Sequence, residues 1–166
     1  LRLPKLLDDG CVLQAGVDMH IWGTGDPGRI VLTRLADERH MGQVKDDGTW
    51  NAPYGPIEAG GPYELTICYE DGAERISRQC YAGEVFLCSG QSNMEMPLRG
   101  FDSQPVNGSL ETAMLAGEHP EIRLFRVSRA VSHEPQEDCT GTWQVSSMRS
   151  ASGFSAVGYH LSLIHI

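Results

Sequence analysis

The sequence lacks a basic surface and any apolar run long enough to span a membrane. Its 13 Lys and Arg residues are outnumbered by 22 Asp and Glu residues, which gives a formal net charge of -9. Nucleic-acid phosphates are bound by clusters of positive side chains, so a nucleic-acid partner is not expected. A transmembrane helix needs about 20 mostly apolar residues in succession. No such stretch occurs, so a membrane partner is not expected either.

The chain also lacks cysteines at close spacing. Its five cysteines form no Cys-x-x-Cys pair, so neither a zinc site nor a redox site is expected: Cys11, Cys68, Cys80, Cys88 and Cys139. Free cysteines within apolar runs behave as small hydrophobic side chains. With no visible signal peptide, this slightly favours a cytoplasmic location over a periplasmic or secreted one. The location is left open, because the chain begins at Leu1 rather than at Met.

Short strands separated by Asp-Gly and Gly-Pro turns are predicted from Val12 to Tyr81. The predicted strands are residues 19–22, 29–36, 41–44, 49–52, 63–69 and 74–81. Strands at this spacing are typical of an antiparallel β-sandwich or jelly roll. Residues 1–82 are therefore predicted to form a β-sandwich domain.

The pattern changes after Glu84. Val85–Cys88 is a continuous apolar run, typical of a buried parallel strand. A helix is predicted over Ser109–Gly117, with Ser109 as N-cap, and another strand over Ile122–Val127. Strand, helix and strand in this order open an α/β domain, which is assigned to residues 83–166. The predicted fold class is therefore α+β overall.

The turn Gly90-Gln91-Ser92-Asn93 follows the predicted buried strand and carries the candidate chemistry. Ligands bind beyond the carboxyl ends of parallel strands, where Ser92 would expose its hydroxyl and its N–H could donate to an oxyanion. The alternative from the local spacing is that Ser92 or Asn93 caps a helix. Met94 stands where a G-x-S-x-G elbow needs its last glycine, so an α/β-hydrolase is disfavoured.

Motifs along nearly the whole chain resemble the sialate O-acetylesterase family, a branch of the SGNH hydrolases. The matching segments are Leu3-Pro4-Lys5-Leu6, Asp9–Gln14, Ile21-Trp22-Gly23, Asp26-Pro27-Gly28, Asp47–Trp50, Ala59–Tyr63, Gly90–Met94, Ile122–Phe125, Trp143-Gln144-Val145 and Phe154–Tyr159. The resemblance implies a β-rich domain followed by an SGNH domain that removes acetyl esters from sugars. Ser92 falls on the family's nucleophile. The implied partner is an acetylated sugar or oligosaccharide, and no metal or organic cofactor is needed.

A serine nucleophile also needs a base. The resemblance implies that an Asp-x-x-His pair and further oxyanion donors lie beyond Ile166. On this interpretation the chain is an N-terminal fragment that is inactive by itself. Asp37-Glu38-Arg39-His40 has the same spacing but lies upstream in the predicted sandwich, so it is not favoured. Structural roles are favoured for His119, His133 and His160.

Two questions stay open at the level of sequence. The tail 160–166 departs from the family pattern, and Leu163–Ile166 is interpreted as non-native sequence or, alternatively, as the end of an ordinary helix. The alternative function is a non-catalytic carbohydrate-binding or interaction module. In that case Trp22, Trp50 and Tyr63 would form a stacking platform, although such aromatics more often fill a core. The sugar and the oligomeric state are not specified.

Overall fold

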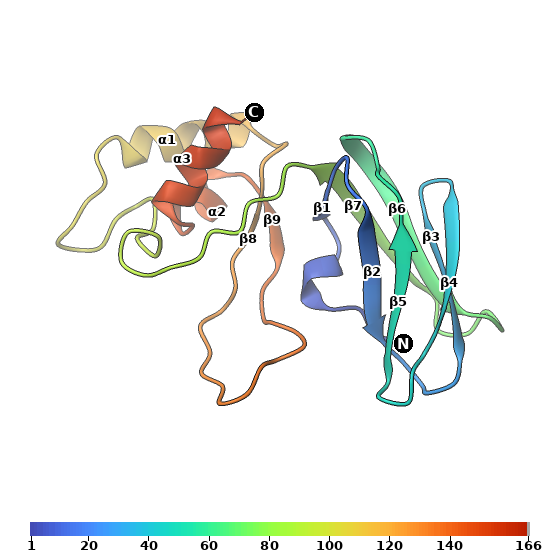
Figure 1. Cartoon of the computed structure of the whole chain (residues 1–166). Coiled ribbons are helices and arrows are strands. Elements are labelled where there is room, and N and C mark those ends of the chain that lie inside the picture. Colours follow the sequence, from blue (N-terminus) through green and yellow to red (C-terminus); the bar gives the residue numbers. More distant parts are fainter. Residues whose placement is uncertain (166) are drawn as a thin grey trace. The chain divides into compact units, whose positions relative to one another are not determined.

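The computed structural model describes residues 1–165, which divide into two compact units (Figure 1). The β unit comprises Leu1–Val85 and Val127–Thr142, and the helical unit comprises Phe86–Arg126 and Trp143–Ile166. Residues 127–142 thus belong with the N-terminal unit although they follow part of the helical unit in sequence. The assignment of 1–82 and 83–166 to separate domains stays a prediction.

A mixed five-stranded sheet dominates the β unit. Its strand order is β1-β7-β6-β3-β4. The strands are β1 (Cys11–Gln14), β7 (Ile76–Gly83), β6 (Gly60–Tyr69), β3 (Ile30–Leu35) and β4 (Glu38–Gln43), and η1 (Lys5–Leu7) precedes them. β1 pairs with β7 in parallel, and the other pairs are antiparallel. The expected antiparallel sandwich or jelly roll is therefore confirmed as a β-rich unit but corrected in detail, because this sheet is mixed. The parallel pair arises because Cys11–Gln14, a strand missed in the sequence, aligns with the last strand of the unit.

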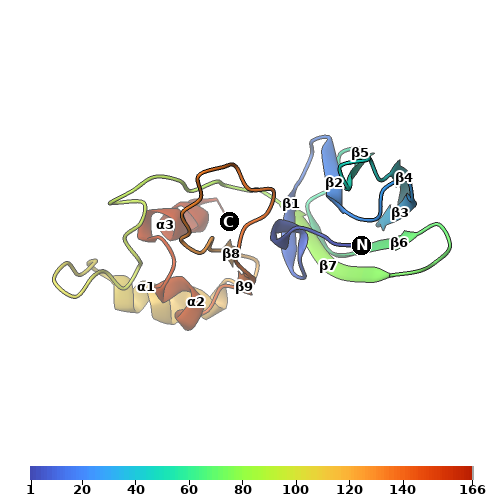
Figure 2. The ribbon, with the colours of Figure 1, turned by 90° about the horizontal axis from the view of Figure 1, so that it is seen from below.

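A separate antiparallel pair covers the open side of this sheet. β2 (Met19–Thr24) and β5 (Thr49–Tyr54) run side by side, and Figure 2 shows the larger sheet curling round toward them. β5 packs close to β4, since a Cβ at Gly42 would lie 2.6 Å from the carbonyl oxygen of Asn51. The β unit is thus a curled half-barrel completed by a two-stranded ribbon.

Buried and exposed side chains alternate along the strands, so one face of each strand lies in a shared core. Ile21, Trp50, Leu65, Ile67 and Tyr69 are almost fully buried there. A buried hydrogen bond of 2.7 Å joins the Thr33 and Tyr54 hydroxyls, which satisfies two polar groups inside the core.

Two of the five cysteines face each other in this core. Cys11 and Cys80 are opposite each other in the β1–β7 pair, and both are buried and free. Contact with the Cys80 thiol, together with burial, raises the pKa of the Cys11 thiol well above its ordinary value. Both side chains are 0% exposed, so the pair packs as small hydrophobic groups in the core.

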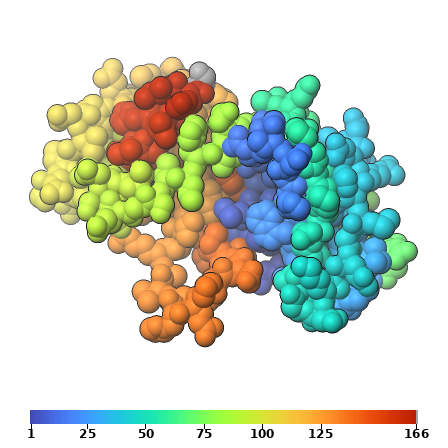
Figure 3. All heavy atoms as spheres, viewed as in Figure 1, coloured from blue at the N-terminus to red at the C-terminus, as the bar shows by residue number. Residues whose placement is uncertain are grey.

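The segment 127–142 is irregular and is attached to the start of the chain. The Lys5 N–H donates to Asp138 Oδ1 at 2.8 Å, and Ser128 N–H donates to the Thr140 carbonyl at 2.7 Å. In Figure 3 this segment is the orange surface beside the dark-blue first residues. One wall of the β unit is therefore built by residues far apart in sequence.

The helical unit combines short helices with a small sheet. Its elements are α1 (Ser109–Leu115), η2 (Ala116–Glu118), β8 (Arg123–Phe125), β9 (Trp143–Val145), α2 (Met148–Ser152) and α3 (Ala156–Ile164). β8 and β9 pair antiparallel. Its core consists of Leu98, Ala113, Ala116, Ile122, Leu124, Ala151, Ala156 and Tyr159. Ser146 Oγ lies in this core, 2.7 Å from the Ala116 carbonyl and 2.8 Å from the Tyr159 hydroxyl.

The predicted parallel strand Val85–Cys88 is absent, and this expectation is wrong. The segment has no strand partner among the described residues, and Leu87 is 92% exposed. The Val85 N–H is bonded instead to the Gln14 side chain at 2.9 Å. An apolar run becomes a buried strand only where neighbouring strands take up its main-chain groups. Within residues 1–165 the helical unit supplies no such neighbour.

The predicted helix and the strand after it are confirmed in position, but the predicted cap is not. Gly108, in the left-handed region at φ 71°, precedes α1, and Ser109 is its first residue rather than its N-cap. The strand predicted over Ile122–Val127 is shorter in the structure, where it is β8.

Among residues 1–165, no helix has the length and apolarity needed to cross a bilayer.

Candidate functional site: the Ser92 turn

The Ser92 turn has an unusual backbone conformation. Ser92 has φ 51°, in the left-handed region that non-glycine residues rarely adopt. Of the described non-glycine residues with positive φ, Ala36 and Glu74 lie in the β3–β4 and β6–β7 connections, where such angles are common. Ser92 lies in no hairpin. Sparsely populated angles outside ordinary turns are concentrated at functional sites.

Local hydrogen bonds close the turn around Ser92. Its carbonyl oxygen accepts from the Glu95 N–H at 3.1 Å and from the Met96 N–H at 3.0 Å. The Met94 N–H donates to the Gln91 carbonyl at 3.1 Å. Gly90, at φ 146°, gives the chain its entry into the turn, and a Cβ there would lie 3.4 Å from that of Met94. The turn thus uses the main-chain carbonyl of Ser92 and leaves its side chain outside.

The hydroxyl of Ser92 is exposed and makes no hydrogen bond to any residue from 1 to 165. The same is true of its N–H, so both groups are available to a bound molecule. The capping alternative is wrong: residues 92–95 form a turn rather than a helix, and no described N–H donates to the Ser92 or Asn93 side chain. Gln91 and Asn93 are also exposed.

The start of α3 supports the turn from behind. Cys88 packs against Gly158, where an added Cβ would lie 3.0 Å from the Cys88 sulfur. Ser155 Oγ accepts from the Gly158 N–H at 3.3 Å as N-cap of α3 and lies 3.5 Å from Met94 Sδ. A serine N-cap and a glycine one turn later therefore connect α3 to both sides of the Ser92 turn.

Main-chain bonds continue this support after the turn. The Ala156 N–H donates to the Met96 carbonyl at 2.8 Å, and the Leu98 N–H donates to the Phe154 carbonyl at 2.8 Å. The segment Phe154–Tyr159 carries part of the family resemblance, but its contact with the Ser92 turn is not predicted by the sequence. The signal was present in the Ser155–Gly158 spacing, which is that of a capped helix start.

The histidines considered as bases have local partners or lie apart from one another. His40, on β4, lies 3.2 Å from Glu38 rather than pairing with Asp37, and its ring is stacked edge-on against Tyr54 at 4.4 Å. His119 lies 3.2 Å from Glu121. His133 is exposed in the 127–142 segment, and His160 is exposed on α3. Within residues 1–165, no histidine is hydrogen-bonded to Ser92.

The tail is helical up to Ile164. Leu163 packs against the core of the helical unit, and the His165 ring lies 5.0 Å from that of Phe86. Ile166 lies outside the described residues.

Within residues 1–165, no group of three or more His, Cys, Asp or Glu side chains is placed to hold a metal ion.

The comparisons with known proteins find relatives among the sialate O-acetylesterases. It is 33% identical to the sialate O-acetylesterase of Mus musculus over 149 residues, and 31% identical to that of Homo sapiens over 129 residues. The chain is homologous to the sialate O-acetylesterases. These matches cover 84% and 71% of this chain but 27% and 23% of the relatives. The chain thus spans about a quarter of the length of these relatives.

A solved structure extends the relation to the fold. The chain matches a carbohydrate acetylesterase from Xanthomonas citri with a TM-score of 0.88 and 30% sequence identity. That match covers 98% of this chain and 36% of the other. No family model matches the chain. The family resemblance inferred from the motifs is confirmed by these relations.

Proposed function

We propose that Ser92 is the nucleophile of an SGNH-type hydrolase that removes O-acetyl groups from carbohydrates. The observation that carries the proposal is an exposed serine held at positive φ, with neither its hydroxyl nor its N–H bonded to the described protein. The homology to sialate O-acetylesterases supports the substrate class. This proposal concerns the activity of the whole protein, because the chain spans only about a quarter of the length of its relatives.

The chemistry follows that of other serine esterases. Ser92 Oγ attacks the acetyl carbonyl carbon while a base takes its proton, and the Ser92 N–H donates to the developing oxyanion. The sugar hydroxyl then leaves with a proton, and water hydrolyses the acetyl-enzyme to acetate. Gly90, Gln91 and Asn93 shape the turn that presents these groups. We assign the base to an Asp-x-x-His pair outside this sequence.

The decisive experiment is a substitution in the longer protein. Ser92→Ala is expected to lower turnover of an aryl acetate by several orders of magnitude, since loss of a nucleophile leaves only binding and oxyanion terms. Ser103→Ala is the matched control, because Ser103 is an exposed serine in a separate turn of the same unit. Retention of more than about a tenth of the activity in Ser92→Ala would exclude the role.

The 166-residue chain itself is expected to show no Ser92-dependent turnover. A serine hydroxyl without a base is a weak nucleophile at neutral pH. The measurement is hydrolysis of a chromogenic acetate by the chain, by Ser92→Ala and by His40→Ala. Turnover lost in both variants would make His40 the base and overturn the assignment of the base to a later Asp-x-x-His pair.

A further inference from the structure

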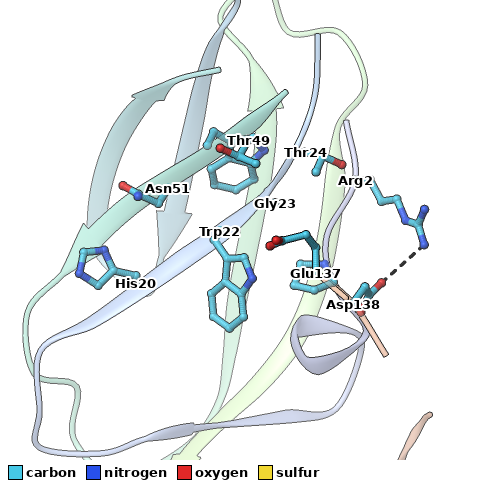
Figure 4. Close-up of a pocket in the computed structure, with 11 residues that line it drawn as sticks. Arg2, His20, Trp22, Gly23, Thr24, Thr49, Asn51, Glu137 and Asp138 are labelled. Carbon is cyan, nitrogen blue, oxygen red and sulfur yellow. Dashed lines mark hydrogen bonds and ion pairs between the residues drawn. The ribbon is translucent and has the colours of Figure 1, made fainter. Parts of the chain in front are cut away.

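A second candidate site lies entirely within the β unit. It is a pocket of about 490 Å³, within the size range of small-molecule sites. Figure 4 shows its lining side chains, which come from β2, from β5, from the chain start and from the 127–142 segment. The proposed esterase chemistry uses none of these residues.

The floor of this pocket is the outer face of the β2–β5 ribbon. Strand alternation turns Ile21, Gly23 and Trp50 toward the core, which leaves His20, Trp22 and Thr24 of β2 exposed on the other face. Trp22 is opposite Asn51 in the register, and Thr24 is opposite Thr49. An indole 39% exposed therefore lies among an imidazole, an amide and hydroxyls.

Polar residues from distant parts of the chain form the wall. Arg2 is held beside β2 by paired main-chain bonds to Thr24, of 2.8 and 2.9 Å. Asp138 lies 3.5 Å from the Arg2 guanidinium and accepts the Lys5 N–H at 2.8 Å. In Figure 4 the Glu137 carboxylate and the Trp22 ring both project into the hollow. The wall therefore presents both hydrogen-bond donors and acceptors.

Trp50 packs beneath the floor of the pocket. Its ring is 1% exposed, and its Nε1 has no hydrogen-bond partner among residues 1–165. The ring packs over Gly23, where a Cβ would lie 2.9 Å from Trp50 Cζ2 and 3.1 Å from Cε2, the atom next to Nε1. Both residues line the pocket. The Trp50 ring lies on the core side of the ribbon, so it supports the pocket floor from beneath and its N–H is not offered to a ligand on the outer face.

We propose that this pocket binds a neutral saccharide unit, separately from the Ser92 turn. A sugar ring presents an apolar C–H face and a rim of hydroxyls that both donate and accept. Trp22 offers the flat apolar surface, and Asn51, Thr49 and Arg2 with the carboxylates of Glu137 and Asp138 offer complementary partners. The arginine neutralises one carboxylate, and the other disfavours an anionic sugar. The site would hold a polysaccharide chain independently of ester cleavage.

Binding is tested in the 166-residue chain carrying Ser92→Ala, so that no turnover consumes the ligand and failure of the esterase proposal does not affect the result. The probes are neutral gluco- and xylo-oligosaccharides of two to four units, N-acetylneuraminic acid and tetramethylammonium. Residue-resolved NMR shifts give both the affinity and the location. We expect a neutral oligosaccharide to shift residues 20–24, 49–51 and 137–138, with little dependence on salt.

Trp22→Ala is expected to weaken this binding about tenfold. Trp22→Phe is expected to retain part of the affinity, because its ring keeps a flat apolar face. Met41→Ala is the matched control, since Met41 is an exposed apolar side chain on β4 outside the pocket. Glu137→Gln is expected to keep most of the affinity for a neutral sugar, because the amide still accepts a hydrogen bond.

Three results would overturn the proposal. One is the absence of pocket shifts with every neutral oligosaccharide at millimolar concentration. Another is equal affinity of Trp22→Ala and the parent chain. The third is binding of tetramethylammonium alone, lost in Glu137→Gln, which would assign the pocket to cations held by the indole and a carboxylate.

Discussion

The two units bury their side chains in different ways. The β unit places large residues such as Trp50, Tyr69 and Ile67 in its core and joins its main-chain groups into a five-stranded sheet. The helical unit has four alanines among its eight core residues, and its sheet has two strands. Since stabilisation follows the apolar area buried, the β unit is expected to be the more stable of the two.

The helix α1 illustrates the difference. It buries Ala113, while Leu110, Met114 and Leu115 are all exposed. A helix of seven residues is marginal by itself and depends on packing of its apolar face. The proposed nucleophile turn thus lies in the less well packed unit, where α3 supports it, whereas the proposed saccharide pocket lies on a hydrogen-bonded ribbon.

Amide hydrogen exchange should separate the two units most clearly. Amides at the centre of β6, such as those of Leu65 and Ile67, are expected to be protected at least about a hundredfold more than those of α1. β6 is bonded on both sides, to β3 and β7, whereas α1 buries little. The measurement is residue-resolved exchange at neutral pH. Equal protection in α1 and β6 would show that the helical unit is as stable as the sheet.

A matched pair of core truncations sharpens the same comparison. Leu65 in β6 and Leu98 in the helical unit are both 0% exposed. Leu65→Ala is expected to lower the free energy of unfolding of the β unit by about 2–5 kcal/mol, because the rigid sheet cannot collapse onto the cavity. Leu98→Ala is expected to cost less, because the partly buried Val106, Phe154 and Leu163 around that core can move inward.

The effects are read from urea unfolding followed by resolved NMR signals of each unit. The signals of one unit serve as the control for a substitution in the other. A cost for Leu98→Ala that equals or exceeds the cost for Leu65→Ala would contradict the comparison.

The sequence predicts the β unit better than the helical unit, because the turn and alternation patterns of the β unit lie within short stretches of the chain. Turns such as Asp47-Gly48 and Asp71-Gly72 fixed where strands end, and alternation fixed which side is buried. The parallel pairing of Cys11–Gln14 with β7 was missed, since no local pattern specifies a partner some 70 residues away. The wall formed by Asp138 was missed for the same reason.

In the helical unit the same rules were less informative. Val85–Cys88 has strand-like composition, yet it stays irregular because strand formation depends on neighbours rather than on composition. The Ser92 turn was located through its glycine and through family motifs. Its positive φ and its support from Ser155 and Gly158 depend on packing between distant segments, which no local pattern encodes.

The smallest expected effect compares two buried tyrosine hydroxyls, one in each unit. Tyr54 is bonded to Thr33 in the β unit, and Tyr159 is bonded to Ser146 in the helical unit, at 2.7 and 2.8 Å. Replacing either tyrosine by phenylalanine removes one hydrogen bond and no ring contact. A typical net cost is about 0.5–1.5 kcal/mol, and more where the partner is left without another bond.

The remaining partner decides which substitution costs more. After Tyr159→Phe, Ser146 Oγ keeps its bond of 2.7 Å to the Ala116 carbonyl. After Tyr54→Phe, Thr33 Oγ1 keeps a longer contact of 3.4 Å, to the His40 carbonyl. Tyr54→Phe is therefore expected to lower the free energy of unfolding of its unit more than Tyr159→Phe does. Adding Thr33→Val should recover part of the loss, because it removes the poorly satisfied hydroxyl. Equal costs, with no recovery in the double variant, would mean that both sites relax enough to satisfy the hydroxyl left behind.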